Sequence, residues 1–172
     1  MKNNIILVGM MGAGKTYIGK ALKTIHPDMN LIDTDEYIEK SNKIKISEIF
    51  ERYGEKYFRD LETSVIKEIT KNDNQIISLG GGAFEREINR ELLNNNGYTI
   101  YLKTSANELY ERIKNETHRP LLKQGFGVEK IEEILVKREN NYKQALITID
   151  TTEKSQYNII EEVMKRIDEY AK

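Results

Sequence analysis

The stretch NIILVGMMGAGKT, from Asn4 to Thr16, joins a short apolar run to the pattern GxxxxGK[ST], which Gly9 to Thr16 match at every fixed position. Glycines in this pattern let backbone N–H groups turn inward around phosphate oxygens, while the lysine reaches the β- and γ-phosphates and the hydroxyl binds Mg²⁺. A helix that begins near Gly14 adds its positive N-terminal end. The alternative is that the glycines serve only a tight strand-to-helix turn. We predict a nucleoside triphosphate site made of Gly12, Ala13, Gly14, Lys15 and Thr16.

Length, charge and cysteine content narrow the class of protein. The chain has 172 residues, enough for one α/β domain with a proper core and rather few for two. Its 27 Lys and Arg residues nearly cancel its 28 Asp and Glu residues, and the resulting net charge of −1 argues against a nucleic-acid binder that works by bulk electrostatics. Because there is no cysteine, disulfides, thiolate metal sites and a cysteine nucleophile are excluded.

The N-terminal residues and the hydropathy predict a compartment. Residues 1–3 lead straight into the first expected strand, which leaves no room for a cleaved signal peptide, and no apolar run approaches about 18 residues. We therefore expect a cytoplasmic protein that has neither a membrane nor a nucleic acid as its partner. We also expect a monomer, although no feature of the sequence reports directly on oligomeric state.

Short apolar runs alternate with longer helical periods along the chain. This rhythm predicts βαβ units, and hence a mostly parallel sheet covered by helices on both faces. Residues 115–127 lack strong periodicity and include Pro120, which is typical of a functional lid or a disordered segment. The expected strands are Ile5–Val8, Asn30–Ile32, Gln75–Leu79, Tyr98–Leu102 and Leu146–Ile149.

Ligands of open parallel sheets gather at the carboxyl ends of the strands, so the residues just past each strand are candidate site residues. Asp33 and Asp35 follow the second expected strand, and Gly80–Gly82 follow the third. Asp33 could hold a water of the Mg²⁺ shell, and Asp35 could hydrogen-bond an acceptor hydroxyl and take its proton, but either could instead cap the next helix. The glycines would let a ligand approach the backbone, or form only a flexible turn. With the phosphate loop, this arrangement favours a small-molecule phosphotransferase.

Three arginines are candidates for binding anions. Arg138 shares one helical stripe with the apolar Ile131, and a guanidinium on an inward face needs an anion such as a ligand carboxylate, unless it extends to solvent. Arg59 lies on another expected helix with Glu62 three residues on, which could be an ordinary surface ion pair. Arg119 lies in the long loop, where it would either close over a γ-phosphate or remain a solvated charge.

Together these segments resemble the shikimate kinases of the nucleoside monophosphate kinase superfamily, and the resemblance covers nearly the whole chain. The family pattern combines a phosphate loop, a DxD, a GExxFRxxE segment, a GGG, an RPLL in the lid and an Arg-xxx-Tyr. The combination is far more specific than any one motif. In this sequence the motifs are Gly9–Thr16, Asp33–Asp35, Gly54–Glu62, Gly80–Gly82, Arg119–Leu122 and Arg138–Tyr142.

The resemblance implies an activity and a fold. The activity is transfer of the γ-phosphate of ATP to the 3-hydroxyl of shikimate, which gives shikimate 3-phosphate in aromatic amino acid (chorismate) biosynthesis. The fold is the three-layer α/β P-loop kinase fold, with a five-stranded parallel sheet of order 2-3-1-4-5 flanked by helices and a mobile lid. Residues 1–172 would form one domain, with an acceptor-binding segment over 34–62 and the lid over 112–127.

The same resemblance implies roles for the candidate residues. Asp35 would activate the 3-hydroxyl, and Lys15 and Arg119 would neutralise charge on the transferring phosphoryl group. Thr16 would hold Mg²⁺, with help from Asp33 through water. ATP would contact Gly12, Ala13, Gly14, Lys15, Thr16, Arg112, which stacks on adenine, and Arg119. Shikimate would contact Asp35, Arg59, Gly80, Gly81, Gly82 and Arg138, with its carboxylate against the two arginines and its hydroxyls against Asp35 and the glycine amides.

One departure from the family pattern concerns the adenine side of the site. Family members often carry a proline in the loop after the last strand, whereas residues 150–155 contain none. Lys154 or backbone groups would therefore have to pack against adenine in its place.

Two other functions remain open. A gluconate-type or nucleotide kinase would share the phosphate loop and the fold, but it gives no reason for Arg59, Arg138 and the three glycines together. A non-catalytic nucleotide-binding module would be expected to have lost Lys15, Asp35 or Arg119, and all three are present.

Overall fold

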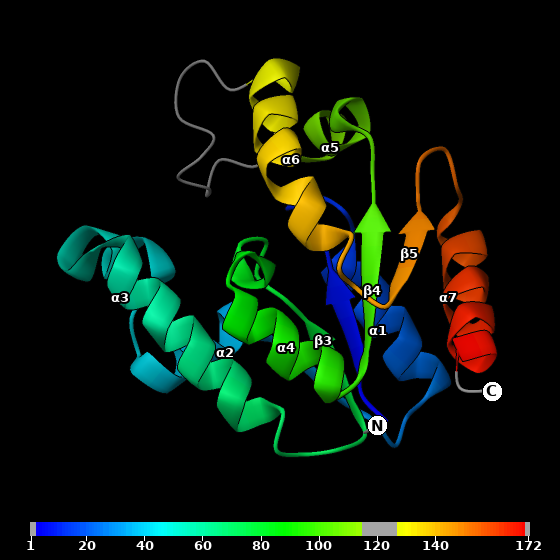
Figure 1. Cartoon of the computed structure of the whole chain (residues 1–172), viewed down its shortest axis with the longest axis horizontal. Helices are drawn as coiled ribbons and strands as arrows, with labels where there is room; N and C mark the ends of the chain where they lie inside the picture. The colour runs from blue at the N-terminus through cyan, green and yellow to red at the C-terminus, as the bar shows by residue number, and fades with distance from the viewer. Residues whose placement is uncertain (1–2, 115–126, 171–172) are drawn as a thin grey trace.

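The computed structural model, which describes residues 3–114 and 127–170, contains a five-stranded parallel sheet of order β2-β3-β1-β4-β5 (Figure 1). This order is the one that the resemblance implied. Each predicted strand is confirmed to within one residue at either end. The strands are β1 (Ile5–Val8), β2 (Asn30–Asp33), β3 (Gln75–Ser78), β4 (Tyr98–Lys103) and β5 (Ile147–Asp150).

The central strand β1 is buried on both faces, as its uninterrupted apolar run predicts for a parallel sheet between helical layers. Its alternate side chains enter two separate cores. Ile5 and Leu7 join one apolar cluster, and Ile6 and Val8 join the other. Each buried side chain of this size stabilises the fold by roughly 1.5–3 kcal/mol, so both faces of the sheet hold the phosphate loop that follows β1 in place.

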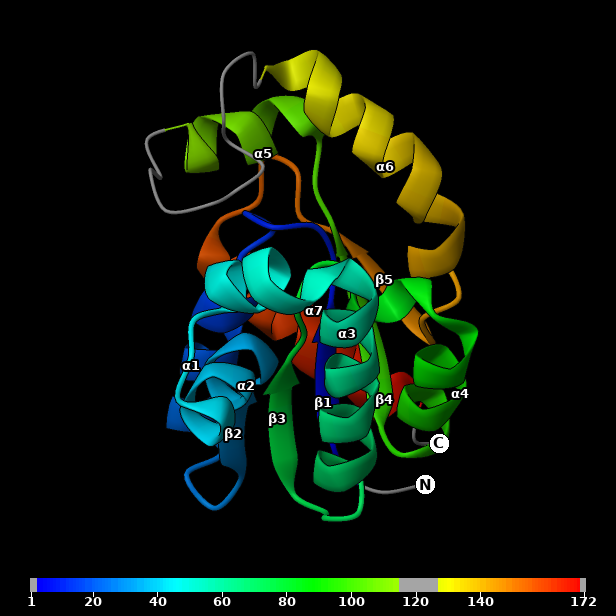
Figure 2. The same ribbon diagram turned by 90° about the vertical axis from the view of Figure 1, so that its left-hand side faces the viewer.

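Helices α1 and α7 cover one face of the sheet, and α3 and α4 cover the other, with α2 beside α3 (Figures 1 and 2). Helices α5 and α6 lie beyond the carboxyl ends of the strands, where the chemistry of such folds is located (Figure 1). The helices are α1 (Lys15–Ile25), α2 (Thr34–Asn42), α3 (Ile46–Ile69), α4 (Glu87–Asn95), α5 (Ala106–Ile113), α6 (Val128–Tyr142) and α7 (Gln156–Tyr170), with a short 3₁₀ turn, η1, at Ala83–Glu85.

Helix α3 changes direction at Gly54, whose backbone has φ 79° and ψ 170°.

Within the described ranges, no helix combines the length and the apolar character needed to cross a membrane. Arg119 and most of the predicted lid, 115–126, lie outside the described residues.

Candidate active site

The phosphate loop connects β1 to α1 in a conformation that depends on glycine. Gly12 and Gly14 have φ values of 80° and 89°, in the left-handed region that side-chain-bearing residues rarely adopt. Lys15 begins α1, and its ammonium donates to the backbone carbonyls of Gly9 at 2.8 Å and Met10 at 2.9 Å. The cation is therefore held over the loop, where the β- and γ-phosphates of a nucleotide would lie.

Thr16, Asp33 and Ser78 bring three side-chain oxygens together beside this loop. The Thr16 hydroxyl donates to Asp33 Oδ2 at 2.9 Å and lies 3.4 Å from Ser78 Oγ. Asp33 Oδ1 accepts the backbone N–H groups of Asp35 and Glu36 and thereby caps α2. Asp33 thus caps the helix, which was the alternative interpretation of this residue, and also faces Thr16. Hard oxygen donors of this kind suit Mg²⁺.

In the part of the chain that the structure describes, no cluster of three His, Cys, Asp or Glu side chains could hold a metal ion. A Mg²⁺ ion at Thr16 and Asp33 would therefore take most of its ligands from phosphate and water, as is common for this ion.

A cavity of about 440 Å³ opens at the carboxyl ends of the central strands; it is lined by most of the predicted nucleotide residues and by Asp35 and Gly81 of the predicted acceptor residues. Its volume lies in the range of small-molecule sites, roughly 300–1,000 Å³. A second cavity, of about 450 Å³, is lined by Lys43, Arg52, Tyr53 and other residues of the predicted acceptor-binding segment 34–62, but by none of the individual residues predicted for the site. We locate the active site in the first cavity, whose lining includes Gly12, Gly14, Lys15, Thr16, Asp33, Asp35, Ser78, Gly81 and Arg112.

The three consecutive glycines after β3 each pack against a different charged group. A Cβ added to Gly80 would lie 2.5 Å from Asp35 Oδ1 and 3.1 Å from Glu62 Oε1. A Cβ on Gly82 would lie 2.6 Å from both terminal nitrogens of Arg59. Side chains at these positions would therefore displace the charged groups, so the glycines let two carboxylates and a guanidinium converge on one stretch of backbone.

Arg138 approaches the same stretch from the opposite side, on α6. Its Nη1 donates to the Gly81 carbonyl at 3.2 Å, and the Tyr142 hydroxyl donates to that same carbonyl at 2.5 Å. Burial raises the pKa of Tyr142 to about 12, which keeps the hydroxyl protonated as a donor. The guanidinium of half-buried Arg138 thus points inward at the glycine turn, as its helical stripe predicted.

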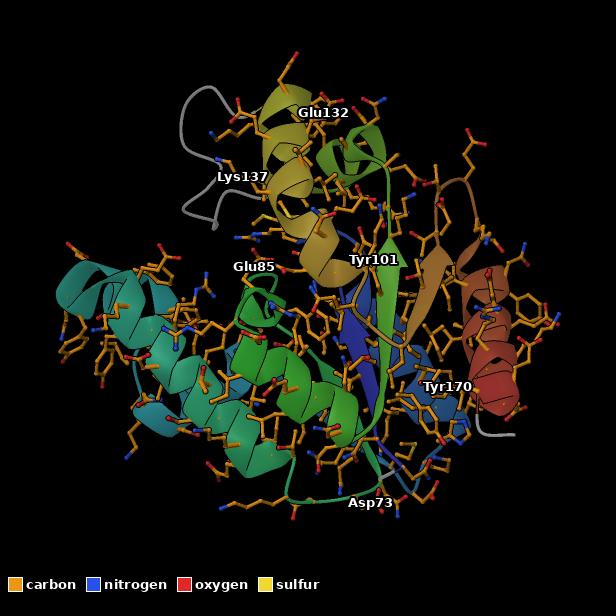
Figure 3. The ribbon with its side chains drawn as sticks, in the orientation of Figure 1. Asp73, Glu85, Tyr101, Glu132, Lys137 and Tyr170 are labelled. Carbon is orange, nitrogen blue, oxygen red and sulfur yellow. The ribbon has the colours of Figure 1, made fainter. Side chains whose placement is uncertain are left out.

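The end of α6 that carries these residues is held by packing and by one hydrogen bond. The Tyr142 ring lies 5.1 Å from the ring of Tyr101 on β4, and Asn141 donates to Glu85 Oε2 at 3.3 Å. Figure 3 shows Tyr101 and Glu85 beneath this part of α6. These contacts hold α6 over the sheet and η1, which aims Arg138 at the glycines.

Arg59 does not form the ordinary surface ion pair that was the alternative interpretation. Its side chain is 18% exposed and donates to Glu62 at 3.0 Å, and the Glu62 side chain is only 1% exposed. A second carboxylate, that of Glu55, lies 3.3 Å away on the outer side. Burial raises the pKa of Glu62 to about 7, an effect that the nearby Asp35 charge strengthens and the Arg59 guanidinium opposes.

Glu62 is a site residue to which the sequence reasoning gave no role, although it was recognised as a neighbour of Arg59 and as the last residue of the GExxFRxxE segment. The three-residue spacing from Arg59 correctly placed the two side chains together on α3, but it carried no information on burial. Burial arises because this part of α3 packs on the glycine turn, a contact between distant segments.

The backbone amide of Gly80 does not fit the expectation that the glycine amides bind acceptor hydroxyls. Its N–H donates to the hydroxyl of Thr34, which is fully buried, at 2.8 Å. That amide already has an intramolecular partner, so the contribution of Gly80 to the site is close approach and not hydrogen-bond donation.

The structure thus brings together nearly all of the predicted residues that it describes. Arg112, on α5, borders the cavity and donates to the Gly12 carbonyl at 3.3 Å and to Glu108 at 3.4 Å. The predicted acceptor residues Asp35, Arg59 and Arg138 surround the glycine turn that follows β3, and Arg112 lies on α5, the helix that follows β4. Such an arrangement can hold a phosphorylated nucleotide and a second, anionic molecule on either side of one lysine.

Comparison with known proteins agrees with this geometry. The family model for shikimate kinase matches residues 11–168. A shikimate kinase from Sulfurihydrogenibium sp. (strain YO3AOP1) is 40% identical over 164 residues, which cover 95% of this chain and 97% of that protein. The solved structure of shikimate kinase from Acinetobacter baumannii in complex with shikimate has a TM-score of 0.91 at 33% identity, and the match covers 99% of this chain and 95% of that one.

A gluconokinase from Sinorhizobium meliloti 1021 provides a contrast, with a TM-score of 0.57 at 14% identity and coverage of 99% of this chain and 94% of that one. This likeness shows a shared fold alone. The match to shikimate kinases, in contrast, runs nearly from end to end at 33–40% identity, so the chain belongs to the shikimate kinase family.

Proposed function

We propose that the chain transfers the γ-phosphoryl group of ATP to the 3-hydroxyl of shikimate and releases ADP and shikimate 3-phosphate. The observation that carries the proposal is the convergence of Arg59, Arg138 and Asp35 on the glycine turn next to the phosphate loop. Two cations and one carboxylate within the same site match an acceptor that is both a carboxylate and an alcohol. The family to which the chain belongs supports the same reaction.

The two arginines bind the acceptor carboxylate in this proposal. Hydrogen bonds between a guanidinium and a carboxylate are short, strong and directional, so they orient the acceptor as well as retain it. Arg138 is already positioned by the Gly81 carbonyl, and Arg59 by Glu62, so little side-chain freedom is lost on binding. A neutral polyol would gain nothing from this pair of charges.

Asp35 receives the proton of the attacking hydroxyl. The hydroxyl oxygen forms a bond to the γ-phosphorus, the bond from the γ-phosphorus to the bridging oxygen breaks, and ADP takes the electron pair of that bond. Asp35 lies in the first turn of α2, against Gly80 and on the lining of the phosphate-loop cavity, where it can reach such a hydroxyl. Phosphoryl transfer depends mainly on positioning and electrostatics, and this rigid turn supplies the positioning.

Lys15 neutralises charge on the β- and γ-phosphates by exchanging its two loop carbonyl partners for phosphate oxygens. When bound, Mg²⁺ supplies electrostatic stabilisation of the phosphate oxygens, and Thr16 and Asp33, the latter through water, are the residues that would hold it. Arg119, outside the described residues, is proposed to act on the γ-phosphate from the lid.

Further parts of the proposal concern organisation. We assign residues 1–172 to one domain, with the acceptor-binding segment over 34–62 and the lid over 112–127. The protein is proposed to work as a monomer in the cytoplasm, where ATP is available as the donor, with ATP and shikimate as its only partners.

The decisive experiment measures ADP release in the presence of ATP and Mg²⁺ across a panel of acceptors that includes shikimate, gluconate and nucleoside monophosphates. Turnover should require shikimate, and NMR of the product should locate the phosphate at the 3-hydroxyl. Turnover with gluconate or a nucleotide alone would refute the proposal in favour of another small-molecule kinase. Nucleotide binding without turnover on any acceptor would favour a non-catalytic module.

A further inference from the structure

The carboxylate of Glu108, on α5, joins two parts of the chain at the nucleotide end of the cavity. Its Oε1 accepts from Arg112 Nη2 at 3.4 Å and from the backbone N–H of Glu153 at 3.3 Å. Arg112 Nη1 in turn donates to the carbonyl of Gly12 in the phosphate loop at 3.3 Å. A continuous chain of hydrogen bonds therefore runs from the phosphate loop through one guanidinium and one carboxylate to the connection between β5 and α7.

The nucleoside must extend toward this chain of bonds. The phosphates are located by Lys15, and the groups proposed to bind the acceptor surround the glycine turn that follows β3. The lining of the cavity also includes Gly12 and Arg112, and Arg112 lies on α5, the helix that follows β4. A planar guanidinium that lines the cavity is suited to stack on a planar aromatic base.

The connection that follows β5 is ordered by its own contacts. Thr151 bonds to Thr104 at 2.7 Å, and the Thr152 N–H is accepted by the Asp150 carboxylate at 3.0 Å. Glu153 then adopts a left-handed backbone with φ 58°, uncommon for a residue with a side chain. This conformation presents its N–H to Glu108, which provides a fixed point in the loop.

The second oxygen of the Glu108 carboxylate indicates that this side chain does not serve the stability of the fold alone. Glu108 Oε2 is buried, and among the described residues it has no hydrogen-bond partner. A buried acceptor without a partner lowers stability, so a group serving stability alone would be expected to use both oxygens.

We propose that Glu108 is a positioning residue for the nucleoside of the bound nucleotide. Its single carboxylate holds the Arg112 guanidinium and the Glu153 backbone at a set separation, so that the two walls of the base site are formed before the nucleotide arrives. The inference rests on the proposed use of a nucleoside triphosphate, but not on the identity of the acceptor.

The test compares Glu108→Ala and Glu108→Gln with a matched control, Glu111→Gln. Glu111 lies on the same helix and pairs with Lys114 at the surface, so the control removes the same charge without touching the base site. Calorimetry measures the Kd of ADP and of inorganic tripolyphosphate without any acceptor, and urea unfolding measures stability.

Glu108→Ala should weaken ADP binding by about tenfold or more, because hydrogen bonds to two groups are lost, one of them charged. Tripolyphosphate, which has no base, should bind as it does to the wild type. Glu108→Gln keeps an oxygen for the Glu153 N–H but loses the charge opposite Arg112, so its effect on ADP should be intermediate. Glu111→Gln should change neither ligand's affinity.

Equal weakening of ADP and tripolyphosphate would overturn the proposal, because it would place the effect on the phosphate loop through Gly12. Unchanged ADP affinity would overturn it as well. A second measurement introduces Glu108→Gln into an Arg112→Ala background. If Glu108 acts through Arg112, the change that Glu108→Gln causes in the Kd of ADP should be smaller in this background than in the wild type. These binding results do not depend on shikimate, so a failure of the proposed reaction and a failure of this inference are distinguishable.

Discussion

Replacing Glu62 by glutamine should change how the stability of the protein depends on pH. In the folded protein, burial raises the pKa of this carboxyl from its ordinary value of 4.5 to about 7. The folded state therefore binds more protons than the unfolded state between these two values. The stabilising contribution of protonated Glu62 is fully present below about pH 4.5 and is lost as the pH rises through about 7.

The size of this effect follows from the pKa shift. A tenfold change in proton affinity corresponds to about 1.36 kcal/mol, so the free energy of unfolding should lose roughly 3 kcal/mol through this one group between pH 4.5 and pH 8. Glutamine keeps an oxygen that can accept from Arg59 but does not titrate. The stability of Glu62→Gln relative to the wild type should accordingly rise by roughly 3 kcal/mol over that range.

The assay is urea unfolding followed by circular dichroism at several pH values from 4.5 to 8. Glu48→Gln serves as the control, because Glu48 lies on the same helix and pairs with Arg52 at the exposed surface, where such pairs contribute about 0–1 kcal/mol. Its difference from the wild type should stay nearly constant with pH. Parallel curves for the wild type and Glu62→Gln would refute the reasoning, since they would mean that Glu62 is ionised in the folded protein throughout.

The same group should affect acceptor binding with a definite sign. Ionised Glu62 would repel a ligand carboxylate at Arg59, so the KM for shikimate should rise as the pH increases through about 7. In Glu62→Gln this rise should be absent. A KM profile identical in both proteins would separate Glu62 from the acceptor site.

Three further substitutions test other parts of the site. Asp35→Ala should lower kcat by about a hundredfold or more while ADP affinity, measured by calorimetry, is nearly unchanged; an equal loss of both would mean that Asp35 supports the phosphate loop. Arg138→Ala removes a charged contact worth about 1.5–3 kcal/mol, so the KM for shikimate should rise about 10- to 100-fold while the KM for ATP stays constant. An unaltered KM for shikimate would exclude Arg138 from acceptor binding. Gly82→Ala places a methyl group 2.6 Å from the terminal nitrogens of Arg59, so the flexible guanidinium should move aside. The KM for the acceptor should therefore rise, with little change in melting temperature. Wild-type kinetics would show that the position of Arg59 is not critical.

Much of the fold could be predicted from local patterns in the chain. Short runs rich in apolar residues located all five strands. The reason is clearest for β1 and β3, whose residues are all buried, as expected for inner strands of a parallel sheet, whereas the edge strands β2 and β5 include exposed residues. The phosphate loop was evident because its chemistry uses the backbone of consecutive residues. The order of the strands, in contrast, came from the resemblance to a family, since periodicity does not say which strands are neighbours.

The tertiary structure alone decided the electrostatics of the acceptor site. Glu62 and Arg59 were recognisable as neighbours on one helix, but burial of the carboxylate depends on α3 packing against the glycine turn, which lies far away in the sequence. Likewise, the Gly80 amide is bound to Thr34 across two strands, and Arg138 reaches Gly81 from α6. Residue type and spacing determine which groups the chain offers and on which face of a helix they lie. Their burial, their partners and their pKa values depend on contacts between distant segments, which exist only once the layers have packed.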